Sequence, residues 1–171
     1  MDTPIISTQR TWLTEVAEND VDTFLPLFSD PVAMEYFPEV MDQKKVAEWI
    51  DMVRGFYAEQ GYCFYKMIRK RDDAVLGYCG PILQKDVDGV DEIEIGYALI
   101  PRYWKQGYAT EAARASINYA FDALNAPRII SLIRRENNPS VRVAENNGLH
   151  FEKDVYRWGH THAVYTRDSR I

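Results

Sequence analysis

The middle of the chain constrains the fold most, because it alternates strand and helix patterns twice in succession. Apolar and polar residues alternate over residues 91–100, and Pro101 stops that strand. A helical pattern follows over residues 107–124, then a strand pattern at 128–133 and a second helical pattern at 139–147. A strand–helix–strand unit of this kind joins parallel strands by a right-handed crossover, so the sequence predicts a mixed α/β sheet.

The segments on either side show the same strand and helix patterns. The further predicted strands cover residues 8–16, 62–69, 74–82, 150–157 and 161–167. The further predicted helices cover residues 21–28 and 42–60, the second capped by Asp42 and ended by Gly61. No linker rich in Pro, Gly and Ser interrupts the 171 residues. Residues 1–171 are therefore expected to form a single α/β (α+β) domain with about seven strands and helices on both faces.

Charge and hydropathy exclude several classes of protein. The formal net charge is −6, and residues 1–60 carry 12 acids against 4 bases. A general nucleic-acid binder would need a basic face, so no nucleic-acid partner is expected. No apolar run approaches the roughly 18 residues of a membrane helix, and the first residues lack the basic and apolar stretches of a signal peptide. A cytoplasmic protein without a membrane partner is the expectation.

The strand-to-helix junction at residues 101–112 is the richest candidate site. The first turn of a helix leaves backbone N–H groups unpaired, and together with the helix dipole they favour an anion such as phosphate. Gly107 lets the backbone approach such a ligand closely. The patterns GxGxxG and Gly-Lys-Ser/Thr are absent, which disfavours dinucleotides and ATP. A purely structural junction is the alternative that these residues alone leave open.

A second strand–helix junction follows at residues 134–148. Asn137 or Asn138 can cap its helix, Pro139 suits the first turn, and Gly148 closes it.

Together these segments resemble the GNAT N-acetyltransferase superfamily, and most closely its ribosomal-protein N-terminal acetyltransferase-like branch. The resemblance covers nearly the whole chain and implies a sheet whose strands splay to admit acetyl-CoA. The motifs that carry it are Glu94-Ile95-Gly96-Tyr97, Tyr103-Trp104, the run Gln-Gly-Tyr-Ala-Thr-Glu-Ala at residues 106–112, Asn137-x-x-Ser140-x-Arg142-Val143, and Gly148.

The resemblance implies acetyl-CoA as co-substrate, bound at the loop that the anion argument also selects. Strand backbone would pair with the pantetheine arm, loop N–H groups would hold the pyrophosphate, and an asparagine would contact the cofactor from the other side. The implied contacts are Tyr97, Ala98, Leu99, Lys105, Gln106, Gly107, Tyr108, Ala109, Thr110 and Asn137. No metal is expected, because neither Cys63 nor Cys79 lies in a CxxC or Cys/His spacing.

Acetylation of an amine requires a base, since an alkyl amine is mostly protonated at neutral pH. Glu94 is the first candidate, because it lies on the strand beside the expected thioester, and Glu92 is the alternative. A solvent-facing strand glutamate without a catalytic role is the structural alternative for Glu94. For the proton donor to the leaving thiolate, Ser140 resembles a serine of the family and Tyr108 is the second choice.

The resemblance implies that the early helices form one wall of the acceptor groove. The acidic N-terminal third would then line that groove. A cationic acceptor would suit such a wall. The last hairpin, with the two histidines of residues 160–162, is expected to border the same groove. The groove residues expected from the early segment are Asp30, Glu35 and Glu39, around Tyr36 and Phe37.

The sequence therefore predicts an acetyl-CoA-dependent N-acetyltransferase for a primary amine, preferably a protein or peptide N-terminal α-amine. A small amine such as a polyamine or an antibiotic is the runner-up. A non-catalytic acyl-CoA sensor is a second class, because Leu132 and Ala144 stand where family members carry a glutamate base and a tyrosine acid. A nucleotide-binding α/β domain is disfavoured by the missing phosphate fingerprints, and a homodimer stays open.

Overall fold

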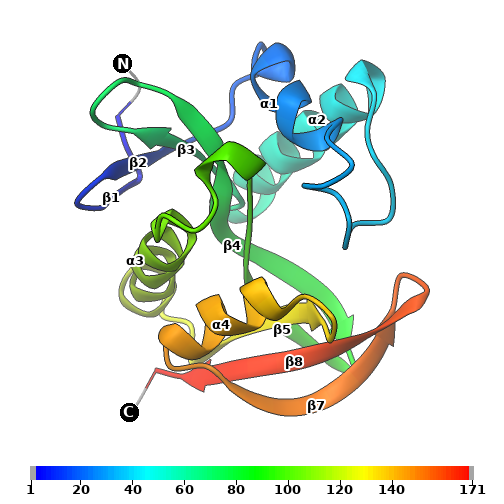
Figure 1. Ribbon diagram of the computed structural model, residues 1–171. Helices are drawn as coiled ribbons and strands as arrows, with labels where there is room; N and C mark the ends of the chain where they lie inside the picture. The colour runs from blue at the N-terminus through cyan, green and yellow to red at the C-terminus, as the bar shows by residue number, and fades with distance from the viewer. Residues whose placement is uncertain (1–2, 170–171) are drawn as a thin grey trace.

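The computed structural model describes residues 3–169 and centres on an eight-stranded sheet (Figure 1). The strands are β1 (Ile6–Ser7), β2 (Thr11–Thr14), β3 (Tyr65–Arg69), β4 (Val75–Val87), β5 (Val90–Leu99), β6 (Arg128–Arg134), β7 (His150–Arg157) and β8 (His160–Asp168). Their order in the sheet is β1-β2-β3-β4-β5-β6-β8-β7, and of these neighbours only β5 and β6 run parallel. The mixed α/β sheet predicted from the sequence is confirmed, and the strand beyond the expected seven is the two-residue β1.

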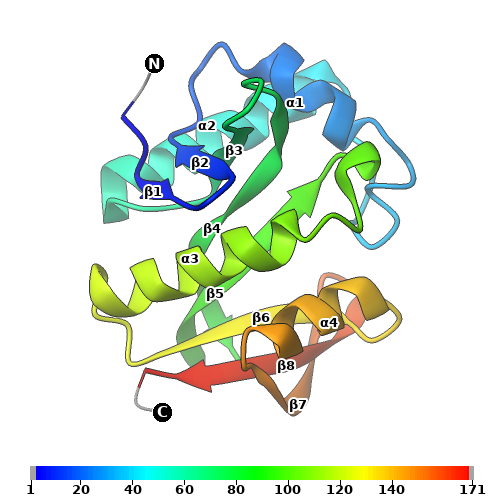
Figure 2. The ribbon, with the colours of Figure 1, turned by 60° about the vertical axis from the view of Figure 1, so that its left-hand side comes forward.

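Helices cover both faces of the sheet. They are α1 (Val21–Phe28), α2 (Gln43–Gln60), α3 (Tyr108–Asp122) and α4 (Asn138–Asn146), with a 3-10 turn η1 (Pro101–Tyr103). Successive residues of β4 show the two sides: the ring of Tyr78 contacts Phe28 and Trp49 of α1 and α2, whereas Cys79 Sγ lies 3.5 Å from Ser116 Oγ of α3. Figure 2 shows α3 and α4 together in front of the sheet. None of the helices in residues 3–169 combines the length and apolar character needed to cross a membrane.

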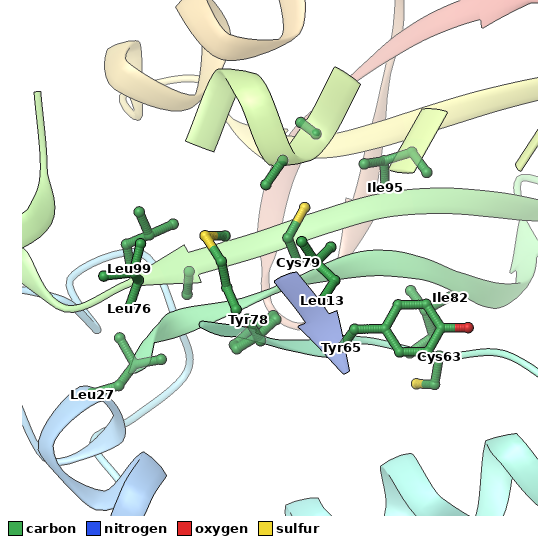
Figure 3. Close-up of a cluster of buried hydrophobic side chains, with 14 of the residues drawn as sticks. Leu13, Leu27, Cys63, Tyr65, Leu76, Tyr78, Cys79, Ile82, Ile95 and Leu99 are labelled. Atoms are coloured by element: carbon green, nitrogen blue, oxygen red, sulfur yellow. The ribbon is translucent and has the colours of Figure 1, made fainter. Parts of the chain in front are cut away.

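The buried core extends along β3, β4 and β5, as Figure 3 shows for residues on both sides of these strands. Leu13, Tyr65, Leu76, Cys79 and Ile95 are all at most 2% exposed. This core fixes the two central strands, from which the loop before α3 departs.

Local signals explain where the elements begin and end. Asp42 caps α2 by accepting a hydrogen bond from the Lys45 N–H at 2.9 Å, and Gly61 ends the helix with φ +82°. Of the strand expected over residues 8–16 only Thr11–Thr14 forms, and residues 8–10 make a turn between β1 and β2 in which the Thr8 N–H donates to the Thr11 carbonyl at 2.9 Å. That turn projects Arg10 toward the start of α3.

The parallel strands β5 and β6 touch at one point and then diverge. Their register holds the single pair Glu94–Ile130, whereas β4 and β5 pair along almost their whole length. Beyond that pair, side chains bridge the strands: Ser131 Oγ donates to the Ile95 carbonyl at 2.9 Å, and the Leu132 N–H donates to Glu94 Oε1 at 3.2 Å. The strands therefore splay beyond residue 95, as the resemblance implies.

Candidate functional site

The loop between η1 and α3 presents a row of open backbone donors. The N–H groups of residues 105–110 have no protein acceptor within residues 3–169. Gly107 adopts φ +81° at the start of α3, a conformation that glycine reaches without strain. The turn places these donors at the positive end of the helix dipole, which is the arrangement that binds phosphate groups.

Arg10 holds this loop from the N-terminal strands. Its backbone N–H and its Nε donate to the two carboxylate oxygens of Glu111 at 2.8 and 2.6 Å, and its Nη1 donates to the Gln106 carbonyl at 2.9 Å. Its guanidinium also lies 4.4 Å from the centre of the Tyr108 ring. Burial alone would raise the pKa of Glu111, but hydrogen bonds from Thr8 and Arg10 hold it below its usual value. The Glu111 carboxylate in the first turn of α3 is thus ionised, its charge is balanced by Arg10, and the pair anchors the loop to the N-terminal strands.

The open edge of β5 faces the gap left by β6. The pairing register turns the backbone of Ala98 toward β4 and that of Tyr97 and Leu99 toward the gap. Trp104 Nε1 donates to the Leu99 carbonyl at 2.7 Å, which fixes the exit of the strand. Across the gap, the Tyr97 hydroxyl donates to the Ser140 carbonyl at 3.1 Å. One wall of the gap is therefore open backbone and the other is the start of α4.

The start of α4 is built around Asn137. Its Oδ1 accepts a hydrogen bond from the Ser140 N–H at 3.3 Å, as the capping pattern predicts. This bond uses the oxygen of the Asn137 side chain and leaves its amide nitrogen for another partner. Asn137 and Ser140 are both partly exposed at the gap.

Glu94 lies where β5 and β6 part. Its Oε1 accepts from the Leu132 N–H at 3.2 Å and its Oε2 accepts from Gln84 Nε2 at 2.6 Å. Burial raises the pKa of Glu94, and these two hydrogen bonds and the charge of Arg157 offset only part of that shift. The Glu94 carboxylate therefore contacts the backbone of Leu132, the position at which the resemblance implies a glutamate base.

Glu92 has a different environment. Arg128 donates to both of its oxygens, with Nη2–Oε1 2.9 Å and Nε–Oε2 3.2 Å, and the residue is only 9% exposed. Its carboxylate is committed to an ion pair, so Glu94 is the better placed of the two candidate bases.

Beyond Glu94, Gly96 of β5 and His162 of β8 lie against aromatic rings, with basic side chains nearby. Gly96 lies against the Phe64 ring, and a Cβ there would come within 2.7 Å of Phe64 Cε1. On β8, His162 is 7% exposed and packs edge-on against Trp158 at 5.3 Å. Burial lowers the pKa of His162, and the nearby charges of Arg134, His160 and Arg157 reinforce this, so its imidazole is neutral.

In the acidic segment that precedes α2, only some of the carboxylates are free to bind a cation. Asp30 accepts from the N–H groups of Val32 and Ala33, and Glu39 pairs with Lys45, so both carboxylates are engaged within the segment. Tyr36 donates to the Glu136 carbonyl at 3.3 Å, which brings this segment to the mouth of the gap. Of the three acids expected to attract a cationic acceptor, only Glu35 is exposed without an ion pair among residues 3–169.

Sequence reasoning missed Arg10, Gln84 and Arg157. Each reaches the site through pairing between distant segments, and none lies in a motif. Within the described part of the chain, no three His, Cys, Asp or Glu side chains gather as a metal ion would require.

Comparisons with known proteins agree with this geometry. A family model described as "Acetyltransferase (GNAT) domain" matches residues 10–150. The chain is 35% identical over 143 residues to the protein YkkB of Bacillus subtilis, covering 84% of this chain and 83% of that protein. It is 31% identical to the uncharacterized N-acetyltransferase p20 of Bacillus licheniformis, covering 86% and 82%.

Among solved structures, the fold is similar to that of RimL, a ribosomal L7/L12 α-N-protein acetyltransferase in complex with coenzyme A. The TM-score is 0.72 and the identity 16%, and the match covers 94% of this chain and 95% of RimL. At that identity the likeness concerns the fold.

Proposed function

The chain belongs to the GNAT acetyltransferase family and is an N-acetyltransferase, and from this premise we propose that it acetylates the N-terminal α-amine of a protein or peptide, with Glu94 as general base. The observation that carries the proposal is the Glu94 carboxylate at the point where β5 and β6 part. It lies next to the gap, on a strand whose Gly96 lies against the Phe64 ring.

The residues around the gap fit acetyl-CoA. When bound, that molecule supplies an acetyl group activated as a thioester. The open N–H groups of residues 105–110 would hold its pyrophosphate, and the backbone of Tyr97 and the N–H of Leu99 at the edge of β5 would pair with its amide-bearing arm. The amide nitrogen of Asn137 would donate from the α4 side.

Replacing Arg10 by glutamine is expected to weaken CoA binding by about tenfold, because the loop loses charged hydrogen bonds to Glu111 and the Gln106 carbonyl. Glu111→Gln should have a similar effect, and the double variant should be no worse than either single variant. Isothermal titration with CoA measures this. Independent, additive losses would show that the two side chains do not act as one anchor.

Glu94 takes the proton that must leave the acceptor. The ammonium group of the acceptor would lose an N–H proton to a Glu94 carboxylate oxygen, directly or through water, and the free amine could then attack the thioester. A carboxylate whose pKa is raised above the usual value is a stronger base than an ordinary glutamate. The bonds from Gln84 and Leu132 hold the carboxylate in place.

Ser140 would donate the proton that the leaving CoA thiolate needs, from the α4 side of the gap. Its backbone is fixed by the Asn137 cap and by the Tyr97 hydroxyl, so its Oγ is positioned at the start of α4. Tyr108 is less suited, because its ring is buried beneath Arg10.

The charges around His162 favour a peptide over a polyamine. Arg134, Arg157 and His160 all lie close enough to His162 to influence its pKa, whereas Asp30 and Glu39 are engaged elsewhere. Arg157 donates to the Asp86 and Lys85 carbonyls and Arg134 pairs with Glu136, so these groups are held in place, and the positive charge of Arg157 disfavours a polycation. The α-N-protein activity in the name of RimL points the same way.

Thiol release from acetyl-CoA tests the acceptor class. The panel contains peptides with a free α-amine, the same peptides with a blocked N-terminus, spermidine and an aminoglycoside. Release with free peptides alone, and one acetyl group added at their N-terminus, is the expected result. Release only with the small amines would overturn the peptide assignment, and tight CoA binding without release across the panel would favour a sensor.

A further inference from the structure

Two basic side chains of β7 bind the hairpin between β4 and β5, although β5, β6 and β8 lie between β7 and β4 in the sheet order. Arg157 Nη1 and Nη2 donate to the Asp86 and Lys85 carbonyls at 2.6 and 3.1 Å. Lys153 Nζ donates to Asp88 Oδ2 at 2.7 Å. The sheet therefore curls at this end, and its last strand lies against the end of β4.

The segment of β4 that Arg157 holds is irregular. The register between β4 and β5 shifts between Gln84 and Val87. Asp86 and Asp88 adopt left-handed backbone conformations with φ +51° and +53°. Residues other than glycine adopt this conformation at a cost, so such a segment persists only where its surroundings hold it. The two hydrogen bonds from Arg157 supply that support.

Gln84 begins this irregular segment and binds the candidate base. Its Nε2 donates to Glu94 Oε2 at 2.6 Å, and the next residue is Lys85. The Lys85 carbonyl is one of the two that accept from Arg157. A displacement of the segment would therefore move the Gln84 amide away from the Glu94 carboxylate.

Arg157 and Glu94 also lie on the same face of the sheet. Glu94 is paired with Ile130, which packs against Val155 in a small buried cluster. Arg157 is two residues after Val155, and side chains two apart on a strand share a face. The positive charge of Arg157 lowers the pKa of Glu94 and so opposes the effect of burial.

Within residues 3–169, no carboxylate pairs with Arg157. Both of its acceptors are neutral carbonyls, and its Nε is buried without a hydrogen-bond partner among the described residues. A guanidinium whose acceptors carry no charge keeps its full attraction for a neighbouring carboxylate.

The other ionisable groups around Glu94 are paired, neutral or exposed. The paired groups are Arg128 with Glu92 and Glu152, Arg134 with Glu136, and Lys153 with Asp88. Burial raises the pKa of two tyrosines and lowers that of a histidine, so these three groups are neutral. They are Tyr78, Tyr97 and His162. His160 is exposed on β8.

We propose that Arg157 is a positioning residue for Glu94, an inference that rests on the proposed role of Glu94 as general base. Its guanidinium holds the irregular segment of β4 and thereby keeps Gln84 on the Glu94 carboxylate. It also directs toward that carboxylate a positive charge that favours the ionised form, which is the form that can accept a proton.

The titration of the Glu94 carboxyl, followed by carbon NMR and assigned with Glu94→Gln, tests the proposal without reference to turnover. Arg157→Gln removes the charge and should raise the pKa of Glu94. With a peptide that has a free α-amine, the rise of kcat/KM that accompanies this ionisation should move to higher pH by the same amount. Below that rise, kcat/KM should fall by roughly twofold to fivefold.

Two further variants separate charge from support. Arg157→Lys keeps the charge and should titrate closer to the unmodified protein. The side-chain amide signal of Gln84 should shift in both Arg157 variants, because lysine lacks the rigid fork that binds two carbonyls. Lys153→Gln is the matched control, since it removes the other bond between β7 and the hairpin and should change neither the Glu94 titration nor kcat/KM.

An unchanged Glu94 titration or an unchanged Gln84 signal in Arg157→Gln would overturn the proposal. An equal pKa shift in Arg157→Lys would also overturn it, because the charge would then have no effect, and so would an equal shift in Lys153→Gln. If the Glu94 titration moved and kcat/KM did not follow, the proposed function of Glu94 would be wrong and its link to Arg157 would stand. Thermal unfolding of each variant shows that folded proteins are compared.

Discussion

Glu94→Gln is expected to lower kcat/KM by about 10²- to 10³-fold while the Kd for CoA stays the same. Glutamine keeps the size of the side chain, and its oxygen can still accept from the Leu132 N–H. It cannot accept a proton at neutral pH. A side chain that only supported the sheet would show a change in stability, and the loss of turnover separates the two roles.

The pH profile provides a second test of the same residue. Because the pKa of Glu94 is raised, its carboxyl is protonated further up the pH scale than an ordinary glutamate, and kcat/KM should rise as this proton is lost. A second rise near pH 8 is expected from the acceptor α-amine itself. Glu94→Gln should remove the lower step and keep the upper one.

As the pH rises and Glu94 ionises, the free energy of unfolding should fall while kcat/KM rises. A folded-state pKa above the unfolded value makes ionisation of Glu94 destabilising, and this cost appears as the pH rises above the unfolded pKa. Glu94→Gln should therefore be no less stable than the unmodified protein at pH 7. Urea unfolding measures this.

Glu92→Gln is the matched control. It breaks the pair with Arg128 and should cost stability, but it should leave the pH profile unchanged. If Glu92→Gln lost turnover as Glu94→Gln does, the assignment of the base to Glu94 would be wrong.

Features encoded within a few residues could be predicted from the sequence. The cap at Asp42, the stop at Gly61, the cap at Asn137 and the left-handed Gly107 are each decided by local backbone chemistry. The junction at residues 101–112 belongs to this class, so its open N–H groups could be expected before the fold was known.

Features that depend on the register between distant segments could not be predicted. Gln84 reaches Glu94 only because β4 is longer than expected, and Arg10 reaches Glu111 only because a turn replaces the first residues of the first predicted strand. The acidic groove wall is expected from the resemblance and the acidic composition of the segment, neither of which can show that Asp30 and Glu39 are bonded within their own segment. Charge counts do not reveal which charges are free.

Gly77→Ala is expected to destabilise the protein by about 3 kcal/mol or more, the range of severe steric substitutions. Gly77 adopts φ +147° in β4, next to the irregular pairing with β3. A Cβ there would lie 2.0 Å from the Ala98 carbonyl oxygen and 2.9 Å from Leu99 Cα. These are backbone atoms of the strand that borders the gap, so the only relief is to push β5 away from β4.

The displaced strand links this stability effect to function. Trp104 and the loop before α3 depart from Leu99, so any folded Gly77→Ala protein should also bind CoA more weakly. Gly55→Ala is the control, because a Cβ at Gly55 in α2 meets nothing within 4 Å and should stabilise the helix by about 1 kcal/mol. Urea unfolding of both variants, with CoA titration of the folded fraction, tests the argument. Equal unfolding midpoints for the two variants would show that β5 can move away at Ala98 without loss of stability, which would contradict the argument.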